Sequence, residues 1–389
     1  MMTASEIRTK VDKMDLYEVI KIPKLILQIF GQWPSENKDM LLNFRGTFSY
    51  AWVATFTFTV FMEIYHVFHN LAAVLRLVTY MSPVVSYMAK ILALKLREDD
   101  FVVLYKFLDD PALTSVPDDL QHYVKEPFRT ARNIGLGYLL SCALTICLMS
   151  LLPLFTERYL PVTFTVFELG RFYHFMYFFQ CFGLMCAGIS NAQVDFTAMS
   201  LSCLVSGQIG VLNENIRCFR EKALQHENLT EELFLARCVY HHSKIITLIA
   251  LIERVLTKIV LIQYITSVVV ICNIGFQLVI VEPFSFPFVL MLTFFTAKML
   301  QLGLYCWFGN EIILSSLAVR DACYESDWIN SDVRVGKMLL IIMERTKRPL
   351  YLTAGKFSVL SLASFTSVIN SAYSFFALMQ TMYVKTEDN

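Results

Sequence analysis

The sequence RPLYLTAGKFSVLSLASFTSVINSAYSFFALMQTMY, residues 348–383, decides the fold class of this chain. From Leu350 to Tyr383 it contains no acidic residue, and it exceeds about 20 residues, the length that an apolar helix needs to cross a bilayer. Pro349 lacks a backbone donor and disfavours helical geometry in the residue before it. We therefore expect a charged helix over 332–348 to end there, and a membrane-spanning helix to begin at Leu350.

The composition of the whole chain indicates a membrane protein. It is 56% hydrophobic and 14% aromatic, with a mean hydropathy of +0.52, which is unlike a soluble domain. The formal net charge is zero, so no general attraction to nucleic acid is expected. Residues 1–46 are mixed in charge and lack the short apolar core of a cleavable signal peptide, so we predict a cytosolic N-terminal segment.

Seven apolar segments predict an all-α membrane protein with seven transmembrane helices. They cover residues 47–66, 71–94, 134–155, 172–207, 255–281, 286–309 and 350–378. Helices 1–4 would occupy 47–207, helices 5 and 6 would occupy 255–309, and helix 7 with a short tail would occupy 350–389.

The basic residues between the spans predict the orientation. When the loops are grouped alternately, about 25 Lys and Arg residues fall on the side of the N-terminus and about 3 on the other side. The positive-inside rule then places the N-terminus in the cytosol and the C-terminus outside the cell, opposite to a G-protein-coupled receptor. The sequon Asn228-Leu229-Thr230 falls on the cytosolic side and is expected to carry no glycan.

The fourth span is too long for a bilayer. Residues 172–212 would rise roughly 60 Å as a helix, against about 30 Å for the hydrocarbon core. We therefore expect a cytosolic helical hairpin over 208–254, in which Asn228 and Glu231 cap the next helix, and further cytosolic helices over 310–349. Together they would form an intracellular anchor domain, which either joins subunits or covers the bundle of a single chain.

Aromatic and methionine side chains gather near the predicted outer ends of the second, third, fourth and sixth spans. Few polar groups interrupt them, which is typical of a pocket for a small apolar ligand. Tyr173 and Tyr177 share a helix face, and with Gln180 they add polar groups. The alternative is that these side chains pack between helices or face lipid. The predicted ligand-binding residues are Tyr80, Met81, Ser150, Phe172, Tyr173, Met176, Tyr177, Gln180, Met291, Phe294 and Phe295.

The last helix carries a second candidate site. Ser367, Ser371, Ser374, Leu378 and Met382 follow one another at spacings of three or four and therefore share one face. Serines followed by large apolar residues would suit a water-lined pore that closes at a hydrophobic gate. The same small residues would suit a close helix–helix contact, and the spacing does not decide between the two.

Charged residues inside the spans do not form a proton path. Lys90, Lys298 and Lys356 lie towards predicted cytosolic ends, where we expect their ammonium groups to reach the membrane surface. Asp195 lies where its helix leaves the bilayer. No chain of acidic residues crosses the membrane, which disfavours a transporter. Catalytic, cofactor and metal-binding motifs are lacking, so we expect neither an enzyme nor a bound cofactor or metal.

Several segments towards the C-terminus resemble the C-terminal signature of insect odorant receptors. They are Trp307–Glu311, Ala322–Trp328, Arg348-Pro349-Leu350, Thr353–Phe357 and Ser371–Tyr383. Over the rest of the chain the resemblance lies in its length and its number of spans. In that family the last helix lines the pore, and Leu378 and Met382 fall where the family's hydrophobic gate lies.

The resemblance implies a subunit of an odorant-gated, non-selective cation channel, embedded in the lipid of a sensory-neuron membrane. Such a subunit binds small volatile ligands in the outer half of its bundle and assembles into a tetramer with the shared odorant-receptor co-receptor. The chain lacks the long additional segment of the co-receptor's fourth loop, so it resembles a ligand-tuned subunit. The alternatives are a G-protein-coupled receptor, a transporter and a gustatory-type receptor channel, although Ser374-Phe375 and Gln380-Thr381 depart from the gustatory pattern.

Overall fold

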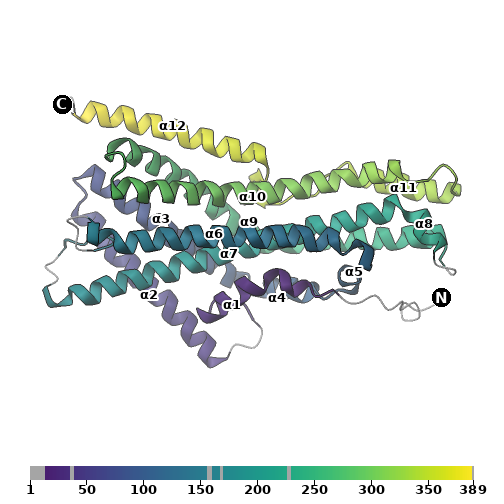
Figure 1. Cartoon of the computed structure of the whole chain (residues 1–389), viewed down its shortest axis with the longest axis horizontal. Coiled ribbons are helices and arrows are strands. Elements are labelled where there is room, and N and C mark those ends of the chain that lie inside the picture. The colour runs from purple at the N-terminus through teal and green to yellow at the C-terminus, as the bar shows by residue number, and fades with distance from the viewer. Residues whose placement is uncertain (1–13, 36–38, 156–159, 167–169, 226–228, 388–389) are drawn as a thin grey trace.

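Long helices, arranged roughly along one axis, make up most of the chain (Figure 1). The computed structural model describes residues 14–35, 39–155, 160–166, 170–225 and 229–387. Within them, seven helices have 26 residues or more: α2 (Met40–His66), α3 (Leu71–Leu96), α6 (His122–Phe155), α7 (Tyr173–Arg217), α9 (Glu231–Ile280), α10 (Phe286–Glu325) and α12 (Leu362–Glu387). Each overlaps one predicted span, so the all-α, seven-helix prediction is confirmed.

Shorter elements connect and cover the long helices. Two short helices precede α2, and three lie between α3 and α6. Single short helices precede α7, follow α7 and follow α10. They are η1 (Leu16–Ile20), α1 (Lys21–Ile29), α4 (Glu98–Phe107), α5 (Pro111–Thr114), η2 (Asp118–Leu120), η3 (Gly170–Phe172), α8 (Phe219–Leu224) and α11 (Val333–Thr346). Helix α11 is the charged helix that the sequence predicts before Pro349.

Helix α7 is the centre of the bundle. It packs along α6 and α10 and also contacts α2, α3 and α9. Every residue from Ser190 to Val205 is buried, so this part of α7 is covered on all sides. A buried polar group without a hydrogen bond is costly. Even so, several polar atoms of this stretch have no partner within the described residues, namely Ser190 Oγ, Asn191 Oδ1, Ser200 Oγ and both amide atoms of Gln193.

The two ends of the bundle differ (Figure 1). At one end α8 and α11 lie beside the continuations of α9 and α10, and we call this the α8–α11 end. Here α9 begins with Thr230 as its cap, whose hydroxyl accepts the N–H of Leu233 at 3.3 Å. The predicted cap Asn228 lies outside the described residues. At the opposite end α7 and α10 begin and α12 approaches its C-terminus.

The last helix begins at Leu362, not at Leu350 as predicted. The segment between them forms a small antiparallel hairpin of β1 (Thr353–Ala354) and β2 (Ser358–Val359). Two of its three turn residues, Gly355 and Lys356, have positive φ angles of 60° and 64°, which are incompatible with a right-handed helix. The apolar composition of the segment does not reveal this backbone conformation, so the predicted start was wrong.

The hairpin is fastened to α9 by polar contacts. The backbone N–H of Thr353 donates to the Glu253 carboxylate at 2.8 Å, and the Thr353 hydroxyl donates to the same carboxylate. The N–H of Gly355 donates to the carbonyl oxygen of Thr257 at 2.9 Å. The chain is thus held against α9 immediately before it enters α12.

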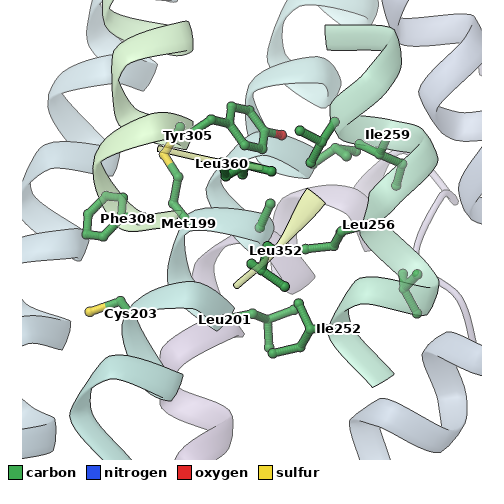
Figure 2. Packing of buried hydrophobic residues seen from close by; sticks show 14 of the residues in the cluster. Met199, Leu201, Cys203, Ile252, Leu256, Ile259, Tyr305, Phe308, Leu352 and Leu360 are labelled. Atoms are coloured by element: carbon green, nitrogen blue, oxygen red, sulfur yellow. The ribbon is translucent and has the colours of Figure 1, made fainter. Parts of the chain in front are cut away.

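Leu352 and Leu360 flank the hairpin and enter the hydrophobic core (Figure 2). Around them lie side chains of α7, α9 and α10, among them Met199 and Leu256. A Cβ atom added at Gly309 of α10 would lie 2.4 Å from the Cβ of Leu360, so glycine permits this close approach. The hairpin is therefore part of the core and not a surface loop.

Hydropathy separates the long helices into two groups. Within the described residues, four segments are long and apolar enough to cross a membrane: Ala73–Leu96, Asp118–Pro153, Gly170–Arg217 and Phe286–Glu325. They include α3, α6, α7 and α10, and Leu362–Leu378 of α12 is a shorter apolar stretch. Of these, α3, α6 and α10 all pack against α7.

Candidate functional site

A cavity of about 70 Å³ lies between α3, α6, α7 and α10. Most of its wall is apolar, and a few polar side chains complete it, a combination typical of small-molecule sites. The apolar or aromatic lining residues are Tyr80, Pro83, Val84, Ile146, Met149, Leu184, Ala187, Gly188, Phe294 and Ala297. The polar lining residues are Tyr138, Cys142, Thr145, Asn191, Lys298 and Gln301.

The polar lining residues lie towards the α8–α11 end of the cavity. Helices α7 and α10 both run towards that end, and Asn191, Lys298 and Gln301 come last among the lining residues of these helices. Helix α6 runs the opposite way, and there Tyr138 and Cys142 come first. The end of the cavity nearer the α8–α11 end is therefore polar, and we call it the inner end of the cavity. The rest of the cavity is apolar.

A buried ion pair adjoins this inner end. Lys90 Nζ of α3 lies 2.6 Å from Asp195 Oδ1 of α7, and neither side chain has any exposed surface. The same ammonium group donates to Gln263 Oε1 of α9 at 2.6 Å. One lysine thereby links three helices in the middle of the bundle.

Asp195 accepts three further hydrogen bonds. Tyr305 of α10 donates its hydroxyl to Oδ1 at 2.7 Å, Tyr138 of α6 donates to Oδ2 at 3.3 Å, and Gln301 Nε2 also donates to Oδ2. Lys298 is buried as well and donates to Gln301 Oε1 at 2.8 Å. The cluster therefore contains two ammonium groups and one carboxylate, and it joins five of the seven long helices.

The expectation that Lys90 and Lys298 reach the membrane surface was wrong, because both are buried. Lys298 lies well inside the bundle, about 18 Å along α10 from its first residue at 1.5 Å per residue. Lys356 is exposed, in the turn of the hairpin. The sequence does contain a signal for the cluster, since ionisable residues within apolar helices are expensive and usually pair with one another. Asp195 and the two lysines could have been read as partners.

Two of the predicted ligand-binding residues line the cavity. The ring centroids of Tyr80 and Phe294 are 6.1 Å apart. The remaining apolar candidates lie elsewhere: Met81, Met176 and Met291 are buried in the core outside the cavity wall, Phe295 is partly buried, and Phe172 is 69% exposed. The structure therefore does not bring the predicted aromatic set together around one space.

The predicted polar groups hold neighbouring segments in place. Tyr177 donates its hydroxyl to the carbonyl oxygen of Ser150 at 2.8 Å, which joins α7 to α6. The rings of Tyr173 and Tyr177 are 6.4 Å apart, as their shared helix face predicts. Gln180 Oε1 accepts the backbone N–H of Val162 at 2.9 Å. These bonds connect the beginning of α7 to the end of α6 and to the segment between them.

The predicted pore residues lie on a face of α12 that the chain leaves open. Ser367, Ser371 and Ser374 are exposed, and Leu378 is 56% exposed. The side chain of Met382 lies outside the described part of the structure. The hydroxyls of Ser371 and Ser374 donate to backbone carbonyls one turn earlier, at 2.9 and 3.0 Å.

The opposite face of α12 packs against α9 and α10. Ala372 is buried, and Phe365 and Phe376 pack against the core. Phe365 lies against Gly303 of α10 and Phe376 against Gly275 of α9. The serine face therefore does not pack against the other described residues of this chain.

Comparisons with known proteins identify the family. A sequence profile described as 7tm Odorant receptor matches residues 70–373. Odorant receptor 2a of Drosophila melanogaster is 28% identical over 219 residues, 54% of this chain and 55% of that protein. Odorant receptor 10 of Aedes albopictus is 24% identical over 192 residues, 49% of this chain and 51% of that protein. The chain thus spans about half the length of these relatives.

The fold agrees with solved structures. The insect olfactory receptor OR5 from Machilis hrabei matches with a TM-score of 0.82, and its complex with eugenol matches with 0.81. Each match covers 94% of this chain and 98% of that structure, at 16% sequence identity. At this identity the match shows the fold alone.

Fold and profile together define a multi-pass helical membrane protein of the receptor class, not an enzyme. The chain belongs to the odorant receptor family, as the resemblance of its C-terminal segments indicates.

Proposed function

We propose that this chain is the ligand-tuned subunit of an odorant-gated, non-selective cation channel. The observation that carries the proposal is the two-sided packing of α12. One face packs on α9 and α10, while Ser367, Ser371 and Ser374 point away from the chain. Within a membrane, a polar face turned away from its own bundle is favourable beside water or another subunit and unfavourable beside lipid. A central pore shared by several subunits provides that environment.

The exposed face of α12 and the family resemblance support an assembly of several subunits around one pore. Several subunits, this chain and the co-receptor among them, would surround one axis with their α12 helices, most simply as a tetramer. Leu378 and Met382 would form the hydrophobic constriction that closes the pore. The α8–α11 end would be the intracellular anchor domain where subunits meet, and the C-terminus would lie outside the cell, as the distribution of basic residues favours.

The cavity would bind a small volatile ligand, with Tyr80 and Phe294 in its wall. Helix α10 connects it to the pore, because Phe294 and Lys298 line the cavity while Gly303, farther along α10, meets Phe365 of α12. A ligand that displaces α10 would therefore displace α12. Its affinity would come largely from apolar burial, at about 25 cal/mol per Å².

Recordings of odour-evoked current test the proposal. Cells would express the chain alone, the co-receptor alone, or both, with a non-hydrolysable GDP analogue in the pipette to block G proteins. We expect a cation current that requires both subunits and persists under the block. A current that disappears under the block, or no odour-evoked current although both subunits reach the surface, would contradict the proposal.

A further inference from the structure

Two side chains at the inner end of the cavity keep hydrogen-bonding capacity that the protein does not use. Lys298 carries three N–H donors, and its hydrogen bond within the described residues goes to Gln301 Oε1 at 2.8 Å. Asn191 is 4% exposed, and its Oδ1 has no hydrogen-bond partner in the described part of the chain. Buried polar atoms are satisfied in most proteins, and this unpaired acceptor and the unsaturated donor line the same cavity, so the pair requires an explanation.

The charges of the cluster make the inner end of the cavity positive. Among the described residues, the ion pair of the cluster is Lys90–Asp195, and the carboxylate is further occupied by Tyr305 and Gln301. Lys298 has a neutral amide oxygen as its partner. The inner end of the cavity therefore favours an electron-rich ligand atom and disfavours a second cation.

We propose that the inner end of the cavity binds the hydroxyl group of a small alcohol or phenol. The ligand oxygen accepts an N–H from Lys298, and the ligand O–H donates to Asn191 Oδ1, so one group satisfies both side chains. The carbon skeleton lies against Tyr80, Met149 and Phe294 in the apolar part. This inference rests on the proposed function, because it names the ligand class of the same cavity.

Ethers, ketones and alkanes satisfy the site only in part. An ether or a ketone accepts from Lys298 and leaves Asn191 Oδ1 unpaired, and an alkane leaves both side chains unpaired. An amine brings a second positive charge towards Lys298. Sites built to hydrogen-bond a ligand reject analogues that lack the group more strongly than apolar walls reject a change of one methylene. The expected order of affinity is therefore alcohol, then ether, then alkane.

Binding to the purified receptor tests the assignment without depending on current. The full chain, assembled with the co-receptor, is titrated with 1-hexanol, hexyl methyl ether and heptane, and the shift of the thermal unfolding midpoint gives each apparent Kd. We expect 1-hexanol to bind about tenfold more tightly than the ether. Asn191→Leu should weaken the alcohol about tenfold and leave the ether unchanged.

Two further variants separate recognition from folding. Lys298→Met should weaken the alcohol and the ether relative to heptane, and Lys298→Gln, which keeps an N–H donor, should restore part of the loss. Met149→Ala in the apolar wall should weaken all three ligands by a similar factor. The midpoint of each variant without ligand shows that it is folded.

The outcomes distinguish this inference from the channel proposal. Equal binding of 1-hexanol and heptane by the wild type, or an unchanged alcohol-to-ether ratio in Asn191→Leu, overturns the hydroxyl site. If Asn191→Leu weakens binding of the ether and not of the alcohol, the hydroxyl site is overturned too, because the Asn191 amide would then present its N–H groups to the ligand. Intact selectivity for 1-hexanol without any odour-evoked current refutes the channel and leaves the hydroxyl site standing.

Discussion

Two ion pairs of nearly equal length lie in different surroundings. Lys90–Asp195 spans 2.6 Å with neither side chain exposed, whereas Arg217–Glu325 at the α8–α11 end spans 2.7 Å with 43% and 52% of the side chains exposed. Water solvates the second pair, so its net contribution is small. If the first pair is broken, an unpaired charge remains among apolar helices. Burial, and not distance, therefore ranks the two pairs.

The largest expected effect comes from removing the buried carboxylate. Asp195→Asn leaves the ammonium groups of Lys90 and Lys298 in the bundle without a counter-charge. Breaking one partner of a buried pair lowers the free energy of unfolding by about 3–5 kcal/mol. We expect a large fall in the thermal unfolding midpoint of the purified receptor and in its surface expression. The double variant Lys90→Met/Asp195→Leu removes both charges of the pair and should recover part of the loss, since Lys298 keeps its charge and the groups that donate to Asp195 lose their acceptor. An Asp195→Asn receptor with the wild-type midpoint would show that the pair does not behave as buried.

Packing at the hairpin is expected to give the next largest effect. In Gly309→Ala the added Cβ would lie 2.4 Å from the Cβ and 2.7 Å from the carbonyl oxygen of Leu360, so the backbone must shift. Overpacking of this kind lowers the free energy of unfolding by about 1–3 kcal/mol. Gly137→Ala on α6 is the control, since a Cβ there meets nothing within 4 Å. Equal midpoints for the two variants would contradict the close contact between α10 and the hairpin.

A partly buried histidine gives a pH-dependent effect between these extremes. His241 Nε2 lies 2.9 Å from Gln208 Oε1, and burial, helped by His242, lowers the pKa of His241 from 6.5 to about 4. Between these values the unfolded chain binds more protons than the folded chain, so stability is complete above pH 6.5 and falls as the pH drops towards 4. From pH 6.5 to pH 5 we expect a loss of about 1–2 kcal/mol.

Thermal unfolding midpoints across pH 4–8 measure this loss. His241→Gln should reduce the slope of the profile between pH 6.5 and pH 4, with the remainder due to His242, whose pKa burial also lowers. His122→Gln at an exposed position is the control. A wild-type profile that is already flat in this window would contradict the lowered pKa of His241.

The exposed ion pair should give the smallest effect. Arg217→Gln removes the contacts with Glu325 and Glu214 and lowers the free energy of unfolding by about 0.2–1 kcal/mol, because the guanidinium is partly solvated. Raising the salt concentration should remove most of the difference between variant and wild type. A loss as large as that of Asp195→Asn would mean that assembly buries this end of the molecule.

The number and approximate extent of the helices are readable from the sequence, because apolar length is a property of one continuous segment. The beginning of α12 is not, since it depends on left-handed backbone at Gly355 and Lys356. Hydropathy predicts a helix over these residues just as well as over the following ones.

The cavity was predicted only in part. Tyr80 and Phe294 line it, but most of the aromatic side chains at similar depth point elsewhere. Sequence position gives the depth of a residue in the bundle and not the rotation of its helix about its axis. For the same reason Lys298 was placed at the membrane surface, although it lies in the cavity wall beside Asn191.

The central claim is that the exposed face of α12 borders the path of the ions, and cysteine accessibility tests it most directly. Ser371→Cys and Ala372→Cys are adjacent, the first on the exposed face and the second buried. Each is expressed with the co-receptor and treated with a positively charged thiol reagent during an odour-evoked current, beside an untreated and a wild-type control. We predict irreversible block of Ser371→Cys and an unchanged current for Ala372→Cys. An unchanged current for Ser371→Cys, or block at Ala372→Cys alone, would contradict the account.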